Sequence, residues 1–314
     1  MIKTSGLRKS FTVKKGATVD AVRGVDLDVT EGEIFGFLGP NGAGKTTTLR
    51  MLSTLLVPDG GEATIAGADL RGDPGQVRMR IGYVAQGGGT TDEVTAREEL
   101  VLQARMYGIG KTEARERANT ALDAFQLTEY ADRPCATYSG GQRRRLDIAL
   151  GVIHHPRVLF LDEPTVGLDP QSRAHMWDEV RRLRADGMTV FITTHYLEEA
   201  DALCDRIAII DHGTIVAEGT PDDLKREISG DVVTVGIEGS TQHAADLLRD
   251  KDDVQRLETI DGGLRLYVDD SSTAIPQILR ALDGAGIEFG KLELHRPSLD
   301  DVFLTKTGRQ MRES

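Results

Sequence analysis

The residues best equipped for chemistry lie in one continuous stretch. It reads Gly39, Pro40, Asn41, Gly42, Ala43, Gly44, Lys45, Thr46 and Thr47. Small and turn-forming residues between the first and last glycine let the backbone turn its N–H groups toward an anion. We therefore expect a phosphate loop in which Lys45 reaches the outer phosphates of a nucleotide and the Thr46 hydroxyl binds Mg²⁺. The N-terminus of a following helix would add the positive end of its dipole.

A pair of carboxylates provides the second chemical group. Asp162 and Glu163 directly follow the apolar residues 158–161, which predict a buried parallel strand, and ligands bind at the carboxyl end of such strands. Asp162 suits the coordination shell of Mg²⁺, and Glu163 can reach a water in line with the γ-phosphate. Gln86 and His195 each end another buried run, where Gln86 could touch the metal or the attacking water and His195 the γ-phosphate.

A second anion-binding helix end is predicted at Ser139, Gly140, Gly141 and Gln142. Ser139 is a natural N-cap, and the two glycines allow a close approach of backbone to ligand. Taken alone, this pattern is more typical of a capped turn than of a binding site. The arginines that follow, Arg143–Arg145, are expected to form a solvated face of the helix.

The elements that must position these residues can be recognised from periodicity. A buried strand over residues 34–38 precedes the phosphate loop, and a helix over residues 48–56 follows, with Leu49, Leu52, Leu55 and Leu56 on one face. Alternating Val25, Leu27 and Val29 predict an antiparallel flank that pairs near residues 2–11. Residues 95–127 have helical period and indicate a helical insertion. Phe11 is placed either to stack on a base or to join the core.

Composition indicates a mixed α/β protein of more than one domain: 314 residues, 39% hydrophobic and 28% charged. A formal net charge of −12 argues against broad nucleic-acid or anionic-membrane binding. Two cysteines, Cys135 and Cys204, are too few for a disulfide framework, so we expect unpaired structural thiols in a reducing compartment. The sequence predicts no secretion signal and no membrane span, so a membrane role requires a partner.

In their order, these motifs resemble those of the ATP-binding subunit of ABC transporters over residues 1–222. The matching residues are the phosphate loop Gly39–Thr46, the Q-loop Gln86, the signature Ser139–Gln142, the Walker B pair Asp162 and Glu163, the D-loop Gly167, Leu168 and Asp169, and the H-loop His195. The signature begins with Tyr138 where Leu is usual, and Ala85 precedes Gln86 where Pro is commoner. Phe11 stands where the family has a base-stacking aromatic, ahead of an insertion at residues 14–18.

The resemblance implies an ABC-type P-loop NTPase core of the α/β class, with an antiparallel β flank and a helical subdomain at about residues 87–155. It also implies bound ATP and Mg²⁺ and a homodimer in which Asp169 and the signature of one copy complete the nucleotide site of the other. Lys45, Gln86, Glu163 and His195 would be catalytic, and Thr46, Gln86 and Asp162 would hold the metal.

Residues 223–314 predict a C-terminal α+β domain of ferredoxin-like type. The order is a strand at 232–237, a helix at about 241–249, a hairpin at 254–268, a helix at 273–282 and a strand at 287–294. The tail, residues 297–308, resembles that of daunorubicin-resistance ATP-binding subunits. This implies export of a drug, antibiotic or lipid through a separate membrane-spanning permease, from the cytoplasmic face of the cell membrane.

Three alternatives stay open at this point. An importer ATPase with a C-terminal regulatory domain shares every catalytic motif. A soluble ABC ATPase that acts on nucleic acid or ribosomes usually carries two cassettes or a long coiled coil, and this acidic chain has neither. A nucleotide-binding module without activity is disfavoured by the intact Lys45, Asp162, Glu163 and His195. Because residues 223–314 show no ligand-binding pattern, we expect that domain to pack rather than to sense.

Overall fold

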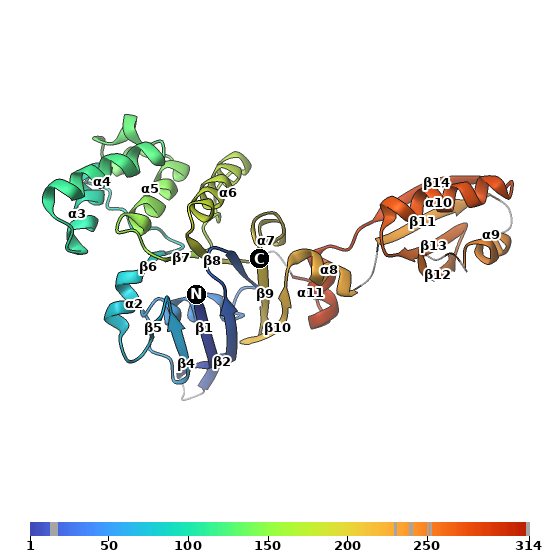
Figure 1. Cartoon of the computed structure of the whole chain (residues 1–314), viewed down its shortest axis with the longest axis horizontal. Helices are drawn as coiled ribbons and strands as arrows, with labels where there is room; N and C mark the ends of the chain where they lie inside the picture. The colour runs from blue at the N-terminus through green and yellow to red at the C-terminus, as the bar shows by residue number, and fades with distance from the viewer. Residues whose placement is uncertain (13–17, 229–230, 239–240, 250, 252, 312–314) are drawn as a thin grey trace. The chain divides into compact units, whose positions relative to one another are not determined.

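The computed structural model describes residues 1–311 except 13–17, 229–230, 239–240, 250 and 252. The chain divides into two compact units, one of residues 1–220 with the segment from Met311, and one of Pro221–Gln310 (Figure 1). The boundary predicted from sequence lies at residue 222. Within the described ranges, no helix is long and apolar enough to span a membrane.

A six-stranded sheet forms the centre of the first unit, in the order β10-β9-β3-β8-β7-β6. Its strands are β3 (Ile34–Leu38), β6 (Ile81–Val84), β7 (Val158–Asp162), β8 (Thr189–Thr194), β9 (Arg206–Asp211) and β10 (Thr214–Gly219). All neighbouring pairs are parallel except β9 and β10. The parallel strands therefore end at one edge, which brings together the residues that follow β3, β6, β7 and β8.

An antiparallel sheet flanks this core in the order β2-β1-β4-β5, as the sequence predicted. It consists of β1 (Ile2–Thr12), β2 (Thr18–Val29), β4 (Gly60–Ile65) and β5 (Ala68–Asp69). Val25, Leu27 and Val29 point into the core, in the predicted alternation. The predicted insertion at residues 14–18 lies, apart from Thr18, outside the described residues.

Seven α-helices are described in the first unit: α1 (Lys45–Leu52), α2 (Pro74–Arg80), α3 (Ala96–Met106), α4 (Lys111–Ala124), α5 (Gly140–Val152), α6 (Pro170–Ala185) and α7 (Leu197–Leu203). The prediction that the first helix continues to residue 56 was wrong. It ends at Leu52, because Thr54 turns the chain through a left-handed conformation with φ of 65°. Leu55 is consequently 60% exposed rather than on a buried helix face.

Helices α3, α4 and α5 form the predicted helical insertion (Figure 1). The expected apolar face of α4 is buried, with Ala114, Ala118, Ala121 and Leu122 on the helix and Phe125 directly after it. Cys135 and Cys204 are free and buried, as expected of structural thiols. Burial raises the pKa of Cys135 to about 11 and that of Cys204 well above its ordinary value, so neither is a reactive thiolate near neutral pH.

The second unit contains the predicted ferredoxin-like fold, in which a four-stranded antiparallel sheet has the order β12-β13-β11-β14. Its elements are β11 (Asp231–Ile237), α9 (Thr241–Leu248), β12 (Val254–Ile260), β13 (Gly263–Val268), α10 (Ser271–Gly284) and β14 (Phe289–His295). Two further helices, α8 (Pro221–Ile228) and α11 (Leu299–Thr307), pack against each other. Ser298 and Asp301 form a capping box at the start of α11, which explains why the tail is helical.

Candidate active site

The phosphate loop connects β3 to α1, as the motif requires. A Cβ atom on Gly39 would lie 2.3 Å from the Ile210 carbonyl oxygen, and one on Gly44 would lie 2.5 Å from that of Ala21. Gly44 also has φ of 107°, which side chains rarely adopt. Both glycines are therefore required because the loop is packed directly against the backbone of neighbouring strands.

Lys45 begins α1 with its side chain buried. Its Nζ atom donates to the carbonyl oxygens of Gly39 at 2.7 Å and Pro40 at 3.2 Å, and it lies 3.1 Å from Oε1 of Glu163. Burial lowers the pKa of Lys45, while the charge and hydrogen bond of Glu163 oppose that shift. The ammonium group thus lies over the loop, where an anion would compete with the carbonyls and with Glu163 for it.

Glu163 is the residue on which the predicted catalytic groups converge. Gln86 Nε2 donates to its Oε2 at 3.0 Å, and His195 Nδ1 lies 3.3 Å from its Oε1, the oxygen that also faces Lys45. Burial alone would raise the pKa of Glu163, but the hydrogen bonds and charges of His195 and Lys45 outweigh it and hold the pKa below its ordinary value. The carboxylate is therefore ionised at neutral pH and available to accept a proton.

The backbone at Glu163 is itself unusual, with φ of 43° in a buried non-glycine residue. Its N–H group donates to both the carbonyl and the side-chain oxygen of Thr193 at 3.1 Å, which stabilises this left-handed conformation. Thr193 is opposite Asp162 in the register of β7 and β8. The sequence motifs do not include Thr193. The signal that points to it is its position one residue before the end of β8, the strand that leads to His195.

Asp162 forms an oxygen-rich group with two threonines. Its Oδ1 accepts hydrogen bonds from Thr46 Oγ1 at 3.1 Å and from Thr193 Oγ1 at 2.7 Å. Asp162 is buried, and one hydroxyl and one carboxylate next to a phosphate loop are ligands that Mg²⁺ prefers. Thr46 and Asp162 therefore fit a magnesium ion, with the remaining ligands from phosphate and water.

Arg144 corrects the expectation that Arg143–Arg145 form a solvated face. Its side chain is only 6% exposed. Its guanidinium donates to the carbonyl oxygens of Ala85 at 2.7 Å, Pro164 at 2.8 Å and Asp162 at 3.3 Å. Because its two neighbours are also arginines, the residue types alone do not show which of the three is buried, but helical spacing places Arg144 on the same face as the buried Asp147 and Ile148.

The signature residues lie at the exposed N-terminus of α5. Ser139 caps the helix, and its capping box with Gln142 confirms the predicted N-cap. Ser139, Gly141 and Gln142 line a cavity of about 200 Å³ with Arg145 and residues of α6. Asp169 is the N-cap of α6, where its carboxylate accepts hydrogen bonds from the backbone and hydroxyl of Ser172. Within one chain, the signature therefore adjoins the start of α6.

Phe11 is 39% exposed near the end of β1, where it pairs with Val19 of β2. The same strand carries Ala21, whose carbonyl oxygen lies close to Gly44. The aromatic ring is thus on the segment of the flanking sheet that adjoins the phosphate loop. This position suits the predicted stacking on a base better than membership of the core.

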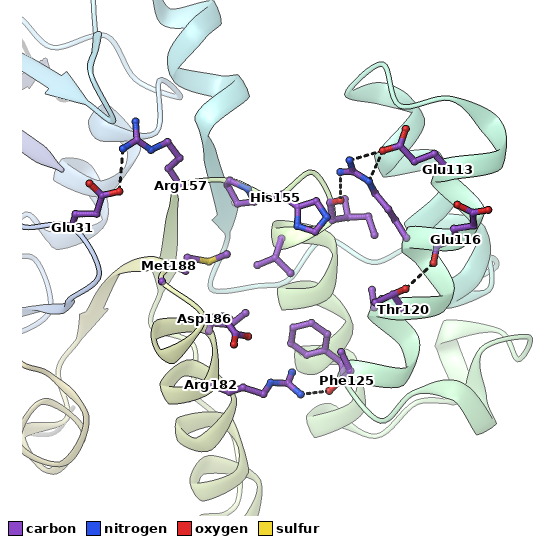
Figure 2. A pocket seen from close by; sticks show the side chains of 18 residues that line it. Glu31, Glu113, Glu116, Thr120, Phe125, His155, Arg157, Arg182, Asp186 and Met188 are labelled. Atoms are coloured by element: carbon purple, nitrogen blue, oxygen red, sulfur yellow. Dashed lines mark hydrogen bonds and ion pairs between the residues drawn. The ribbon is translucent and has the colours of Figure 1, made fainter.

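A separate cavity of about 620 Å³ lies between the helical insertion and the core (Figure 2). It is lined by α4, by the segment after α5 and by the turn from α6 to β8, and none of the predicted site residues is among its lining residues. Arg182 crosses it, donating to the Ala124 carbonyl oxygen, with its guanidinium 5.2 Å from the centre of the Phe125 ring. Arg182 thus joins the insertion to the core away from the phosphate loop.

Comparison with known proteins gives two family matches: the ABC transporter family over residues 22–166, and the C-terminal domain of DrrA1-3-like ATP-binding proteins over residues 219–307. The chain is 43% identical to the daunorubicin resistance ATP-binding protein DrrA2 of Streptomyces coeruleorubidus, over 98% of this chain and 95% of the relative. It is 36% identical to the linearmycin resistance ATP-binding protein LnrL of Bacillus subtilis over the full length of both.

Among solved structures, the ATP-binding cassette MJ0796, determined as a dimer in a post-hydrolysis state with ADP and Pi, matches with a TM-score of 0.64. The identity is 27%, and the match covers 70% of this chain and 98% of that cassette.

Proposed function

This chain belongs to the ATP-binding subunits of ABC transporters of the daunorubicin-resistance type and hydrolyses ATP to power export, and we propose that it does so as a head-to-tail homodimer beneath a separate permease. The observation that carries ATP hydrolysis is the convergence of Lys45, Gln86 and His195 on the Glu163 carboxylate. This carboxylate adjoins Asp162, whose own side chain is held by Thr46.

The geometry suggests a role for each of these groups. Glu163 accepts the proton of the water that attacks the γ-phosphorus, while Gln86 and His195 orient that water and the γ-phosphate. Lys45 neutralises the phosphate oxygens. To do so, it gives up its contact with Glu163 and contacts the phosphates instead. Thr46 and Asp162 would hold Mg²⁺, which would neutralise charge on the phosphates. The glycine-rich loop, Gly39–Thr47, surrounds the phosphates with N–H groups, and Phe11 stacks on the base.

A second copy completes this site. Ser139, Gly140 and Gly141 form a helix N-terminus at which Ser139 and Gly140 are exposed, and such an end stabilises an anion through its free N–H groups and its dipole. In the dimer, the signature and Asp169 of one copy cap the nucleotide that Lys45 of the other copy holds. The dimeric form of a relative of known structure supports this arrangement.

The cargo of the transporter is proposed to be a drug-like, antibiotic or lipid molecule. The relatives are named for daunorubicin, linearmycin and Nod factor, which are the basis for this class. The permease would place the chain at the cytoplasmic face of the membrane. Nucleic acid is not a proposed partner, because the chain carries a net charge of −12.

Export can be tested in cells that carry the chain with its permease. We expect these cells to retain less daunorubicin or linearmycin than cells in which the chain carries Glu163→Gln, because the permease then lacks hydrolysis. Retained drug is measured by fluorescence or by mass spectrometry after loading. Equal retention of every tested compound by the two strains would contradict a drug-export role, whereas uptake that depends on Glu163 would favour the importer alternative.

The second unit is expected to support assembly rather than catalysis. A chain that ends at Thr220 should bind nucleotide normally, because the phosphate loop and Glu163 lie upstream, but should co-purify less with the permease. The reciprocal control is the full-length chain with Lys45→Ala, which should lose nucleotide binding and still co-purify. Normal assembly and export by the truncated chain would contradict this role, as would a metabolite that binds residues 223–314 and stops ATP hydrolysis.

A further inference from the structure

Arg144 joins the signature helix to the backbone of the catalytic residues. Its guanidinium donates to the carbonyl oxygen of Ala85, the residue directly before Gln86. It also donates to the carbonyl oxygens of Asp162 and Pro164, the residues on either side of Glu163. One buried side chain therefore fixes the backbone next to both groups whose side chains meet in the 3.0 Å hydrogen bond between Gln86 and Glu163.

Asp147, on the same face of α5, provides a second connection to the Q-loop. One of its carboxylate oxygens accepts the N–H of Gly89 at 3.0 Å, and its Oδ2 lies 3.9 Å from the Arg144 guanidinium. Gly88, with φ of 73°, approaches so closely that a Cβ atom there would lie 2.7 Å from Oδ2. Helix α5 thus holds the chain on both sides of Gln86, through Arg144 before it and Asp147 after it.

Ser139 is the N-cap of the same helix and contacts the nucleotide of the other copy in the proposed dimer. We propose that Arg144 is a positioning residue that holds Gln86 and Glu163 of its own chain in the hydrolytic geometry, from the helix whose N-terminus caps the partner's nucleotide. This inference rests on the proposed dimer. A planar guanidinium that donates to three carbonyl oxygens allows these backbone segments little displacement. A misplacement of about 1 Å near reacting groups can lower the rate about a hundredfold.

The first test separates turnover from binding. Arg144→Gln should lower the ATP turnover number at least about tenfold, while the Kd for ATP measured with a fluorescent analogue stays within about twofold. Arg144→Lys keeps a charged donor but lacks the planar guanidinium, so its turnover should lie between those of wild type and Arg144→Gln. Arg182→Gln is the matched control. It removes another arginine that joins the insertion to the core. Its turnover should stay within about twofold of wild type, because among the described residues Arg182 contacts Ala124, Phe125 and Glu179, which are not site residues.

Three outcomes would overturn the proposal. They are a weakened Kd with unchanged turnover, an equal loss in Arg182→Gln, and wild-type turnover in folded Arg144→Gln. Thermal melting establishes whether Arg144→Gln is folded. If it is not, Asp147→Asn takes its place, because the amide retains the volume of the side chain but weakens the contacts to Arg144 and Gly89. The same loss of turnover at constant Kd is expected, and wild-type turnover in Asp147→Asn would likewise overturn the proposal.

The second test asks in which nucleotide site Arg144 acts, using mixed dimers with one active site. When Arg144→Gln is in one chain and Glu163→Gln in the other, the working Glu163 and the altered Arg144 share a chain, and turnover should fall about tenfold or more. When both substitutions are in one chain, the working Glu163 belongs to the unaltered partner, and turnover should match the reference dimer. A loss in the second dimer but not the first would show that Arg144 acts through the signature and would refute the proposal.

The reference dimer contains one wild-type chain and one Glu163→Gln chain. It separates the test of the shared nucleotide site from the test of the positioning role of Arg144. If this dimer does not form, the proposed shared site fails. Arg144 is then judged by the first test alone, which needs no mixed dimer.

Discussion

Replacing Glu163 with Gln is expected to lower ATP turnover by roughly 10²- to 10⁴-fold, the range over which a positioned general base acts. The amide has nearly the shape of the carboxylate, but it cannot accept the proton of the attacking water. In the structure, the lost charge is the one that faces both Lys45 at 3.1 Å and His195 at 3.3 Å. ATP binding should be preserved, because Lys45 no longer divides its charge between Glu163 and the phosphates.

This variant should accumulate as an ATP-bound dimer, which size-exclusion chromatography with light scattering would detect. The matched control is Glu179→Gln, which removes another buried glutamate that pairs with Arg182 on α6. Its turnover should stay within about twofold of wild type, since the ion-pair partner of Glu179 in the described part of the chain is Arg182, which is not a site residue. Turnover at the wild-type rate in Glu163→Gln would remove Glu163 from the role of general base.

Two inactive chains are expected to restore activity when they are mixed. A Lys45→Ala chain lacks the phosphate-binding ammonium, and a Ser139→Ala chain lacks the capping hydroxyl. In the mixed dimer, Lys45 of one chain meets Ser139 of the other, which gives one intact site and one doubly defective site. After random mixing, half of the dimers are mixed and each has one intact site, so about a quarter of the wild-type rate should return.

A mixture of Lys45→Ala with Glu163→Gln is the negative control. Lys45 and Glu163 contact each other within one chain and therefore serve the same nucleotide site. In the mixed dimer, one site lacks Lys45 and the other lacks Glu163, so neither site is complete. No recovery is expected there. If the first mixture also fails to recover, although cross-linking shows that mixed dimers form, the signature does not complete the partner's site.

Much of the fold followed from short-range patterns. Alternating Val25, Leu27 and Val29 marked the antiparallel flank, and Ser139 marked the start of α5, because strand pleat, helix period and end capping all depend on residues a few positions apart. The order of strands and helices beyond residue 222 likewise sufficed for the ferredoxin-like fold. The end of α1 was missed, because the turn at Thr54 competes with an apolar pattern that would extend the helix.

The sequence by itself determined which chemical groups are present: a phosphate loop, two carboxylates, a glutamine, a histidine and a second helix N-terminus. Only the tertiary structure decided that Lys45, Gln86 and His195 meet at one carboxylate, because these residues follow strands that are far apart in the chain but end at the same edge of the sheet. It also decided that Arg144 is buried while its neighbours are not. The burial of Arg144 depends on its hydrogen bonds to the carbonyl groups of Ala85, Asp162 and Pro164. The sequence around Arg144 does not predict where these groups lie.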